Sequence, residues 1–342
     1  AWGIAPMVAL HLSIAIGGML VFLRKLGVAR FAQTIGALAF GLSGYLFTRA
    51  HFLSINVALA WLPWILVAAH ELIQENSRRA HLKLAAFLAL QWLAGHAQTA
   101  WYSLGLLVFW VFYWVLVEGK GAQLREKLLG LAKGMAIAGG VTAVQLLPTL
   151  EFLSQSQRAT QVDPELALTY SLWPWRLITL LAPKFFGSPV DGNFWGYGNF
   201  WEDAIYIGLI PLLLATIWAF NSLVKSRGRR KSLFLGFVIL VSLLLALGKN
   251  TPIFPWLFSH VTSFSMFQAP TRFSLWAVFS LAVLAAFGAE NWRAPERRSL
   301  YWMRLSVAGA VAVLFVGFLA EPFLEANGFL IEATFMPVLQ SE

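Results

Sequence analysis

Apolar residues gather along this chain in long runs that are separated by short polar stretches. Runs of about 20 apolar residues are long enough to cross the hydrocarbon core of a membrane as helices. The pattern therefore predicts an all-α polytopic membrane protein with about ten transmembrane helices. We expect these helices at residues 5–23, 31–48, 53–70, 82–97, 98–117, 128–148, 203–220, 232–248, 270–289 and 305–322.

The composition supports the same class of protein. Of the 342 residues, 59% are hydrophobic and only 12% are charged, with a mean hydropathy of +0.69. A soluble domain carries about a quarter charged residues. The chain has no cysteine, which excludes disulfides and thiolate metal sites. Paired glycines inside two predicted helices, Gly17–Gly18 and Gly139–Gly140, permit close packing of neighbouring helices.

Lysine and arginine are distributed unevenly between the two sets of alternating loops. Nineteen of the 25 basic residues lie within the stretches 24–30, 78–83, 120–133, 225–231 and 293–304. Cytoplasmic loops carry such an excess. The net charge of +9 is then a sign of topology, and no nucleic-acid partner is predicted. The expected location is the bacterial cytoplasmic (inner) membrane, with both chain ends outside. The segments expected in the cytoplasm are 71–81, 119–127, 223–231 and 290–300.

One long segment, from Gln145 to Asp203, is too polar to lie inside a bilayer. It mixes acidic and basic residues with many aromatic ones, and its prolines prevent a single long helix. We expect residues 149–202 to form an extracytoplasmic loop. Within it, 164–183 would supply one or two short interfacial helices, and 188–200 an exposed turn. Such a loop is typical of a chemical or recognition site, although a loop that only caps the bundle remains the alternative.

Polar residues on the predicted outer face are the candidates for function. Polar groups near membrane depth are costly and tend to be functional. Arginine binds phosphate oxygens, a carboxylate can act as a general base on an acceptor hydroxyl, and aromatic rings pack on sugars. One outer cavity with these groups would suit a sugar attached to a phosphate-bearing lipid. Taken singly, Arg49 and Arg272 fit interface anchoring as well as a ligand role. His51 and His96, taken singly, fit helix capping or packing better than a ligand role. The candidates are Arg49, His51, His96, Gln98, Glu151, Arg158, Glu202, Asp203 and Arg272.

Glu202 and Asp203 stand side by side where a helix is expected to begin, near Ala204. Adjacent residues on a helix point about 100° apart, so the two carboxylates are not expected to do the same job. We expect Asp203 to cap the helix. Glu202 would reach the cavity and orient an acceptor or sugar hydroxyl as an auxiliary catalytic group. The alternative is that both residues are structural.

Other chemistries find little support in the sequence. The histidines show no HxxxH or HExxH spacing, so no metal site and no cofactor are predicted, while a divalent metal stays open. No serine lies in a G-x-S-x-G turn, and the predicted cytoplasmic loops contain no glycine-rich phosphate loop.

Seven stretches occur in a characteristic order: HFLSINVALAWLPWIL, LAGHAQTAWY, AVQLLPTLEFLSQSQRA, LLAPKFFG, WEDAIYIGLIPLLLA, LALGKNTPIFPWLF and FQAPTRFSLWAVFSLAVLAAFG. Together they resemble the bacterial YfhO family of integral membrane proteins, which have the architecture of GT-C glycosyltransferases. The resemblance covers the chain from about residue 30 to residue 290. It implies use of a polyprenyl-phosphate-linked sugar on the outer face and transfer to a cell-envelope polymer or protein.

The resemblance also assigns individual residues. His51 matches the family's histidine before its AWLP run, and His96 with Gln98 matches its GHxQ motif. Glu151 and Arg158 match the QLLPxxE…R block, Glu202 the acidic residue before YxG, and Arg272 the PxR motif. Gln268 stands where the family often has arginine.

GT-C enzymes usually place a catalytic Asp or Glu in the first outer loop, whereas this chain opens where their second helix would start. We therefore expect residues 1–322 to be a transmembrane core that lacks the first helix, the first outer loop and the main catalytic base. Residues 323–342 would begin an extracytoplasmic C-terminal region. The implied function is glycosyl transfer. A non-catalytic transporter or assembly partner for lipid-linked glycans is the alternative.

Overall fold

The computed structural model describes residues 3–119, 121–155, 163–196, 198–225 and 228–292, and within these ranges it contains helices and turns but no strand. The α-helices are α1 (Ile4–Lys25), α2 (Arg30–Gly41), α3 (Gly44–Thr48), α4 (Leu53–Glu75), α5 (Arg78–Leu93), α6 (Ala97–Phe112), α7 (Leu124–Gln155), α8 (Pro164–Leu168), α9 (Leu209–Lys225), α10 (Arg229–Ala246), α11 (Ile253–His260), α12 (Thr262–Ser265) and α13 (Ser274–Trp292). Short 3-10 turns include Pro174–Leu180 and Pro270–Phe273, which runs directly into α13.

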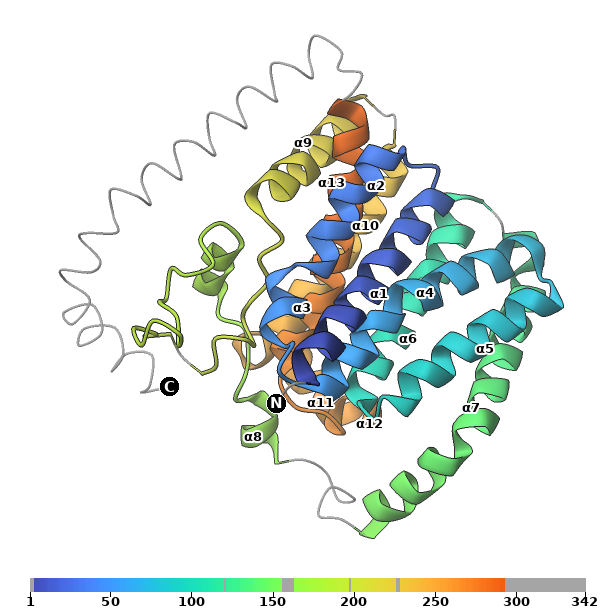
Figure 1. Cartoon of the computed structure of the whole chain (residues 1–342), viewed down its shortest axis with the longest axis horizontal. Coiled ribbons are helices and arrows are strands. Elements are labelled where there is room, and N and C mark those ends of the chain that lie inside the picture. The colour runs from blue at the N-terminus through green and yellow to red at the C-terminus, as the bar shows by residue number, and fades with distance from the viewer. Residues whose placement is uncertain (1–2, 120, 156–162, 197, 226–227, 293–342) are drawn as a thin grey trace.

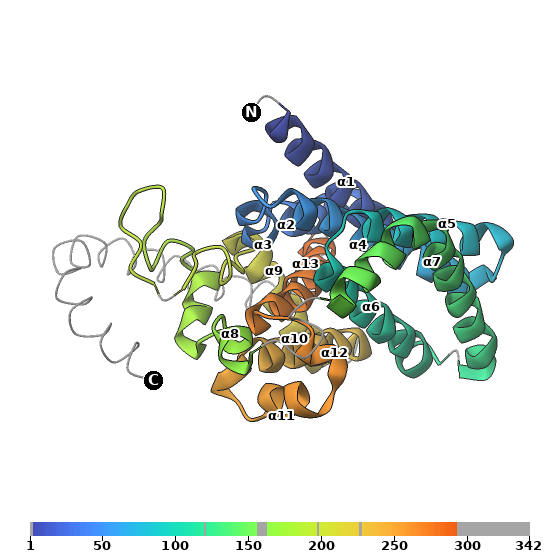
Figure 2. The same ribbon diagram turned by 90° about the horizontal axis from the view of Figure 1, so that it is seen from below.

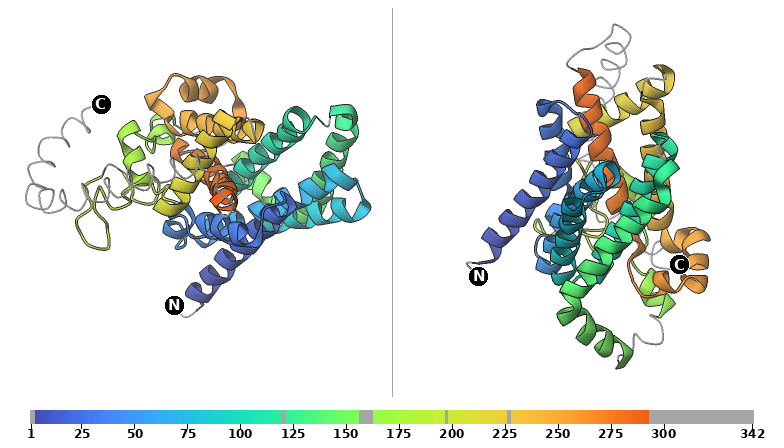
Figure 3. Two further views of the ribbon diagram at one scale, coloured as in Figure 1. Left: turned by 90° about the horizontal axis from the view of Figure 1, so that it is seen from above. Right: turned by 90° about the vertical axis from the view of Figure 1, so that its right-hand side faces the viewer.

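Helix α13 is the centre of the bundle (Figure 1), where it packs against α2, α9 and α10. In its most apolar 18-residue window 89% of the residues are buried, against 11% for α7. Helix α7 lies at the edge of the molecule beside α5 (Figure 3). The protein leaves most of the apolar surface of α7 uncovered. Such a surface is unfavourable in water but suits contact with lipid.

Helices α1 and α4 pack closely because of a glycine. A Cβ on Gly18 would lie 2.7 Å from the ring of Trp64, so only glycine allows this approach. The indole N–H of Trp64 then donates to the main-chain oxygen of Ile14 at 2.9 Å. The predicted role of this glycine pair is confirmed at Gly18. For Gly140, of the second pair, no atom of the described residues outside its own helix backbone lies within 4 Å of where its Cβ would be, so this part of the chain makes no close contact there.

The structure confirms an all-α protein with several apolar helices, but fewer spans reach full length than the expected ten. Among the described residues, five helical stretches are long and apolar enough to cross a membrane: Ile4–Lys25, Leu53–Glu75, Ala97–Val117, Leu124–Gln155 and Pro270–Trp292. Helix α2 has 12 residues, or about 18 Å at 1.5 Å per residue, well short of the roughly 30 Å hydrocarbon core. The segment expected at 305–322 lies outside the described residues.

Two predicted helices have different boundaries. The run 31–48 divides into α2 and α3 at Leu42 and Ser43, where the Ser43 hydroxyl accepts from the Leu46 N–H at 3.4 Å. This is an N-cap, which starts a new helix. The run 203–220 becomes helical only at Leu209. Short helices do occur within 164–183, as α8 and the turn Pro174–Leu180.

Polar loop residues gather at two opposite ends of the bundle. At one end, Glu71 pairs with Lys25 at 2.9 Å and with Lys83 at 2.6 Å. At the other end lie α3, α8, α11 and α12, which face the viewer in Figure 2. Among the described residues, the basic positions Lys25 and Lys83 thus lie at a different end from α3, α8, α11 and α12.

A labelling experiment tests which end is outside. The chain has no native thiol, so a single cysteine gives a clean signal. Val190 is 94% exposed in the long loop, and Glu75 is exposed at the opposite end. From the distribution of basic residues, a membrane-impermeant maleimide is expected to label Val190→Cys but not Glu75→Cys in intact cells. If only Glu75→Cys is labelled, the orientation of the protein in the membrane is the opposite of the predicted one. Ser188, in the same loop, is a poor probe because it is 5% exposed.

Candidate functional site

Glu202 and Asp203 lie in a turn that is buried at the end of the bundle that holds α3. The residues after this turn, 204–208, have no regular secondary structure, and the Gly44 N–H donates to the main-chain oxygen of Tyr206 at 2.6 Å. The expectation that Asp203 caps a helix is therefore wrong, because the helix starts six residues later, at Leu209.

Glu202 is held between two arginines that come from distant parts of the chain. Its Oε2 accepts from Nη2 of Arg49 at 3.1 Å. Arg272 donates from Nη2 to Oε1 at 2.6 Å and from Nε to Oε2 at 3.0 Å, a fork-to-fork arrangement that is strong and geometrically specific. Arg49 is 1% exposed and Glu202 is 2% exposed. Both carboxylate oxygens are thus engaged by cations.

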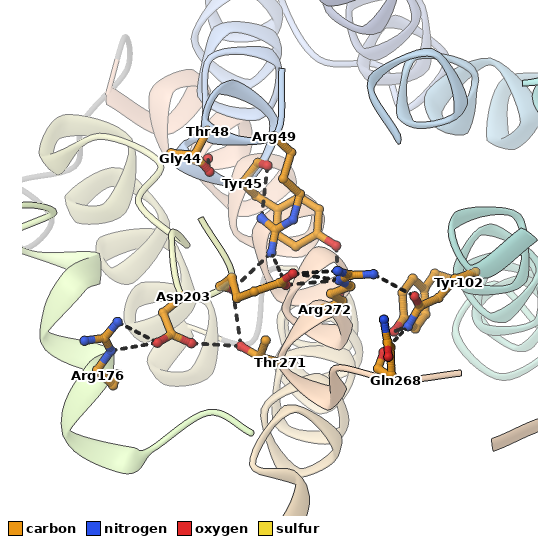
Figure 4. Close-up of polar contacts among 12 residues, drawn as sticks. Gly44, Tyr45, Thr48, Arg49, Tyr102, Arg176, Asp203, Gln268, Thr271 and Arg272 are labelled. Carbon is orange, nitrogen blue, oxygen red and sulfur yellow. Dashed lines mark hydrogen bonds and ion pairs between the residues drawn. The ribbon is translucent and has the colours of Figure 1, made fainter. Parts of the chain in front are cut away.

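Further polar side chains hold Arg272 in place (Figure 4). Its Nη1 donates to Oε1 of Gln98 at 2.9 Å, and the Gln98 amide donates to the Tyr102 hydroxyl at 2.8 Å. The Tyr45 hydroxyl donates to the main-chain oxygen of Arg272 at 2.9 Å. The Gln98 amide also donates to the main-chain oxygen of Gln268. Position 268 therefore contributes through its backbone here, and this contact does not depend on its side chain.

Asp203 forms a second ion pair on the other side of the same turn (Figure 4). Nε and Nη2 of Arg176 both lie 2.7 Å from its Oδ2, and the Thr271 hydroxyl donates to its Oδ1 at 3.2 Å. Thr271 also donates to the main-chain oxygen of Glu202 at 3.3 Å. We call the set Arg49, Arg176, Glu202, Asp203 and Arg272 the arginine–carboxylate cluster.

The two carboxylates respond differently to burial. Burial would raise the pKa of Glu202, but Arg49 and Arg272 outweigh it and hold that pKa below its usual range. Burial raises the pKa of Asp203, and Arg176 offsets this only in part. With both ionised, three guanidinium groups face two carboxylates, and the cluster keeps a net charge of +1. Glu202 is therefore a weak proton acceptor, and the cluster as a whole attracts anions.

His96 lies beside this cluster and is electrically neutral. Burial lowers its pKa to about 4, and the nearby charge of Arg272 acts in the same direction. The backbone N–H of Thr99 donates to its Nδ1 at 3.1 Å, so the neutral ring carries its proton on Nε2. The helix-capping role of His96 is confirmed. Its Nε2–H group is available to donate a further hydrogen bond. His51 is exposed and packs against the rings of Phe52 and Trp201.

The structure brings together most, but not all, of the residues chosen from the sequence. Arg49, Gln98, Glu202 and Arg272 are joined by direct polar contacts, with His96 close by. Asp203, the next residue in the chain, is linked to this group through the Thr271 hydroxyl. Glu151 is exposed near the end of the peripheral helix α7. Its inclusion in the same cavity is not supported by any described contact. Arg158 lies outside the described residues.

One member of the cluster, Arg176, and three residues that contact the cluster or Gln98 were not identified from the sequence. Arg176, Thr271 and Tyr45 act through partners that are 27 or more positions away, whereas Tyr102 contacts Gln98 one helical turn before it. One signal did exist for Arg176, because it is the single charged residue in the apolar stretch SLWPWRLITLLAP. A charge in such surroundings requires a buried partner, although the sequence could not show which one.

Comparison with known proteins settles the family. A family model described as the bacterial membrane protein YfhO matches residues 1–339. The chain belongs to the YfhO family. This identification agrees with the apolar helices of membrane-crossing length, and makes the chain a bacterial membrane protein. No curated protein and no solved structure matches it. In the described part of this YfhO-family protein, no group of three or more His, Asp or Glu side chains is arranged to hold a metal ion.

Proposed function

We propose that this YfhO-family protein is a GT-C-like membrane glycosyltransferase. It takes a sugar from a polyprenyl-phosphate-linked donor and transfers it to a cell-envelope polymer or protein on the outer face of the cytoplasmic membrane. The observation that carries the proposal is the buried arginine–carboxylate cluster with its net positive charge, at the end of the bundle that the sequence predicts to be external. A lipid phosphate that arrives through the membrane would meet this charge at the helix ends.

Arg272 is the group best placed to bind the donor phosphate. Its side chain is 17% exposed, whereas those of Arg49 and Arg176 are 1% and 3% exposed. A guanidinium has five N–H groups. Within the described residues, Glu202 and Gln98 use the Nε–H and one N–H on each terminal nitrogen. Two N–H groups are left for a phosphate oxygen, and Nε2–H of His96 would add a third donor.

The proposed reaction breaks the bond between the sugar C1 and the phosphate oxygen and forms a bond between C1 and an acceptor hydroxyl oxygen. Negative charge develops on the departing polyprenyl phosphate, where Arg272 would stabilise it more than in the ground state. The hydroxyl proton passes to the departing polyprenyl phosphate or to water, because a carboxylate base needs a free oxygen. Glu202 has a lowered pKa and both oxygens bound to arginine, so its auxiliary role is to position Arg272 and Arg49 rather than to accept that proton.

Donor binding and transfer by the purified full chain in nanodiscs test this proposal. We expect saturable binding of a polyprenyl-phosphate-linked sugar that polyprenyl phosphate competes for and polyprenol, which lacks the phosphate, does not. Transfer to cell-envelope acceptors is then followed with a radiolabelled sugar. Equal competition by polyprenol would contradict a phosphate site. Movement of the intact lipid-linked sugar across the bilayer, without transfer, would instead identify a transporter.

A further inference from the structure

A small pocket lies on the far side of the Glu202–Asp203 turn from Arg272. Its volume is about 60 Å³, and it is lined by Thr48, Arg176, Thr179, Phe186, Phe194, Phe200 and Tyr206 among others. A cavity needs about 10–15 Å³ to hold one water molecule, so this pocket suits a ligand of roughly four to six non-hydrogen atoms. The segments that form it, α3 and residues 174–206, do not take part in the proposed donor contacts.

Arg176 brings a buried positive charge with an unused donor to this pocket. The residue is 2% exposed, and its Nε and Nη2 face Asp203. Its Nη1 lies on the other edge of the guanidinium and has no hydrogen-bond partner within the part of the chain that the structure describes. A buried donor without a partner costs about 1–3 kcal/mol, and more when it is charged. The unsatisfied donor therefore marks a position where a hydrogen-bond acceptor would be stabilised.

The aromatic residues around Arg176 hold its guanidinium in this position but do not supply a hydrogen-bond acceptor for Nη1. Its central carbon lies 4.2 Å from the ring centre of Phe186 and 5.8 Å from that of Phe194, which are cation–π contacts. A Cβ at Gly196 would collide with Nη1, so glycine at this position is what leaves room for the charged group. Phe200, Tyr206 and the Asp203 carboxylate complete the wall, and Asp203 already pairs with the Nε and Nη2 edge of the guanidinium. An anion would therefore contact the opposite edge, at Nη1, in surroundings of low polarity where the hydrogen bond is strengthened.

We propose that this pocket is a second anion site, which binds a phosphate-class oxyanion through Nη1 of Arg176. A tetrahedral oxyanion has five non-hydrogen atoms and matches the volume. Arginine, with its planar fork, is the usual partner for such groups. The ligand is either free phosphate or the phosphate of a lipid headgroup. The site is separate from Arg272, and the proposal does not rest on the glycosyltransferase assignment.

Titration of the purified full chain with inorganic phosphate, at constant ionic strength set with chloride, tests the site. The thermal midpoint of unfolding is expected to rise with phosphate and to saturate, as a ligand that binds only the folded state requires. Arg176→Lys keeps a cation beside Asp203 but loses the fork, so phosphate affinity should fall about tenfold or more. Gly196→Ala should have the same effect by displacing Nη1 without a change in charge.

Two control variants separate this site from other anion contacts. Lys184→Gln removes an exposed lysine of the same segment, which pairs with Asp191, and should leave phosphate binding unchanged. Arg230→Gln removes an exposed arginine of α10 and should also leave phosphate binding unchanged.

Nanodiscs of phosphatidylcholine with or without phosphatidic acid distinguish a lipid headgroup from free phosphate. The site is supported if either ligand raises the thermal midpoint of the wild type and if this rise is lost in both Arg176→Lys and Gly196→Ala. The proposal is overturned if neither phosphate nor phosphatidic acid raises the thermal midpoint in a saturable way. It is also overturned if a folded Arg176→Lys or Gly196→Ala protein shows the same rise as wild type.

Discussion

Replacement of Glu202 by glutamine is expected to destabilise the protein by about 3–5 kcal/mol, the usual cost of removing one partner from a buried ion pair. The amide has no charge, so two buried guanidinium groups, those of Arg49 and Arg272, would lose their counter-ion. Arg49 is 1% exposed and cannot reach water without a rearrangement of α3. The measurement is the thermal midpoint in detergent, followed by the fraction that stays monodisperse after heating.

Two other carboxylates provide controls for this result. Glu151→Gln changes an exposed group and should leave the midpoint within the small range of surface substitutions. Asp203→Asn should fall between the two. Asparagine keeps one oxygen for Arg176, its amide N–H can donate to the Thr271 hydroxyl, and Asp203 neutralises one arginine rather than two. If Glu202→Gln is as stable as wild type, the ion pairs of Glu202 do not hold this end of the bundle together, and a direct role in substrate binding becomes the better account of this residue.

Arg272→Ala is expected to weaken binding of a polyprenyl-phosphate-linked sugar by about 10- to 100-fold. A charge-assisted hydrogen bond contributes about 1.5–3 kcal/mol, and 1.4 kcal/mol corresponds to a factor of ten in affinity. Arg272 is the most exposed arginine of the cluster and has N–H groups to spare. Fluorescence titration with the donor in nanodiscs measures the effect.

A loss of affinity has to be distinguished from a loss of structure, because Arg272 also pairs with Glu202. Arg272→Lys keeps the charge near Glu202 but cannot form the fork, so it should fold like wild type and still bind the donor more weakly. Lys184→Gln, remote from the cluster in an exposed pair, should bind normally. Donor affinity that is unchanged in a folded Arg272→Ala protein would remove Arg272 from the donor site.

The sequence by itself determined the class of the protein and the position of most helices. The runs 5–23 and 53–70 correspond to α1, Ile4–Lys25, and to α4, Leu53–Glu75. Such predictions succeed because the hydropathy of a run and the backbone bonds of a helix are both local properties. The YfhO family could be recognised for a similar reason, since its motifs are continuous stretches of sequence.

Only the tertiary structure decided which polar groups meet. Glu202 and Arg49 are separated by 153 positions, and Glu202 and Arg272 by 70. Their pairing depends on how α3, the long loop and the turn before α13 come together at one end of the bundle. The same packing explains why Asp203 faces Arg176 instead of capping a helix, since the non-helical chain after it is hydrogen-bonded to Gly44 through Tyr206. A buried charge takes whichever opposite charge the fold places within reach, and no local pattern contains that information.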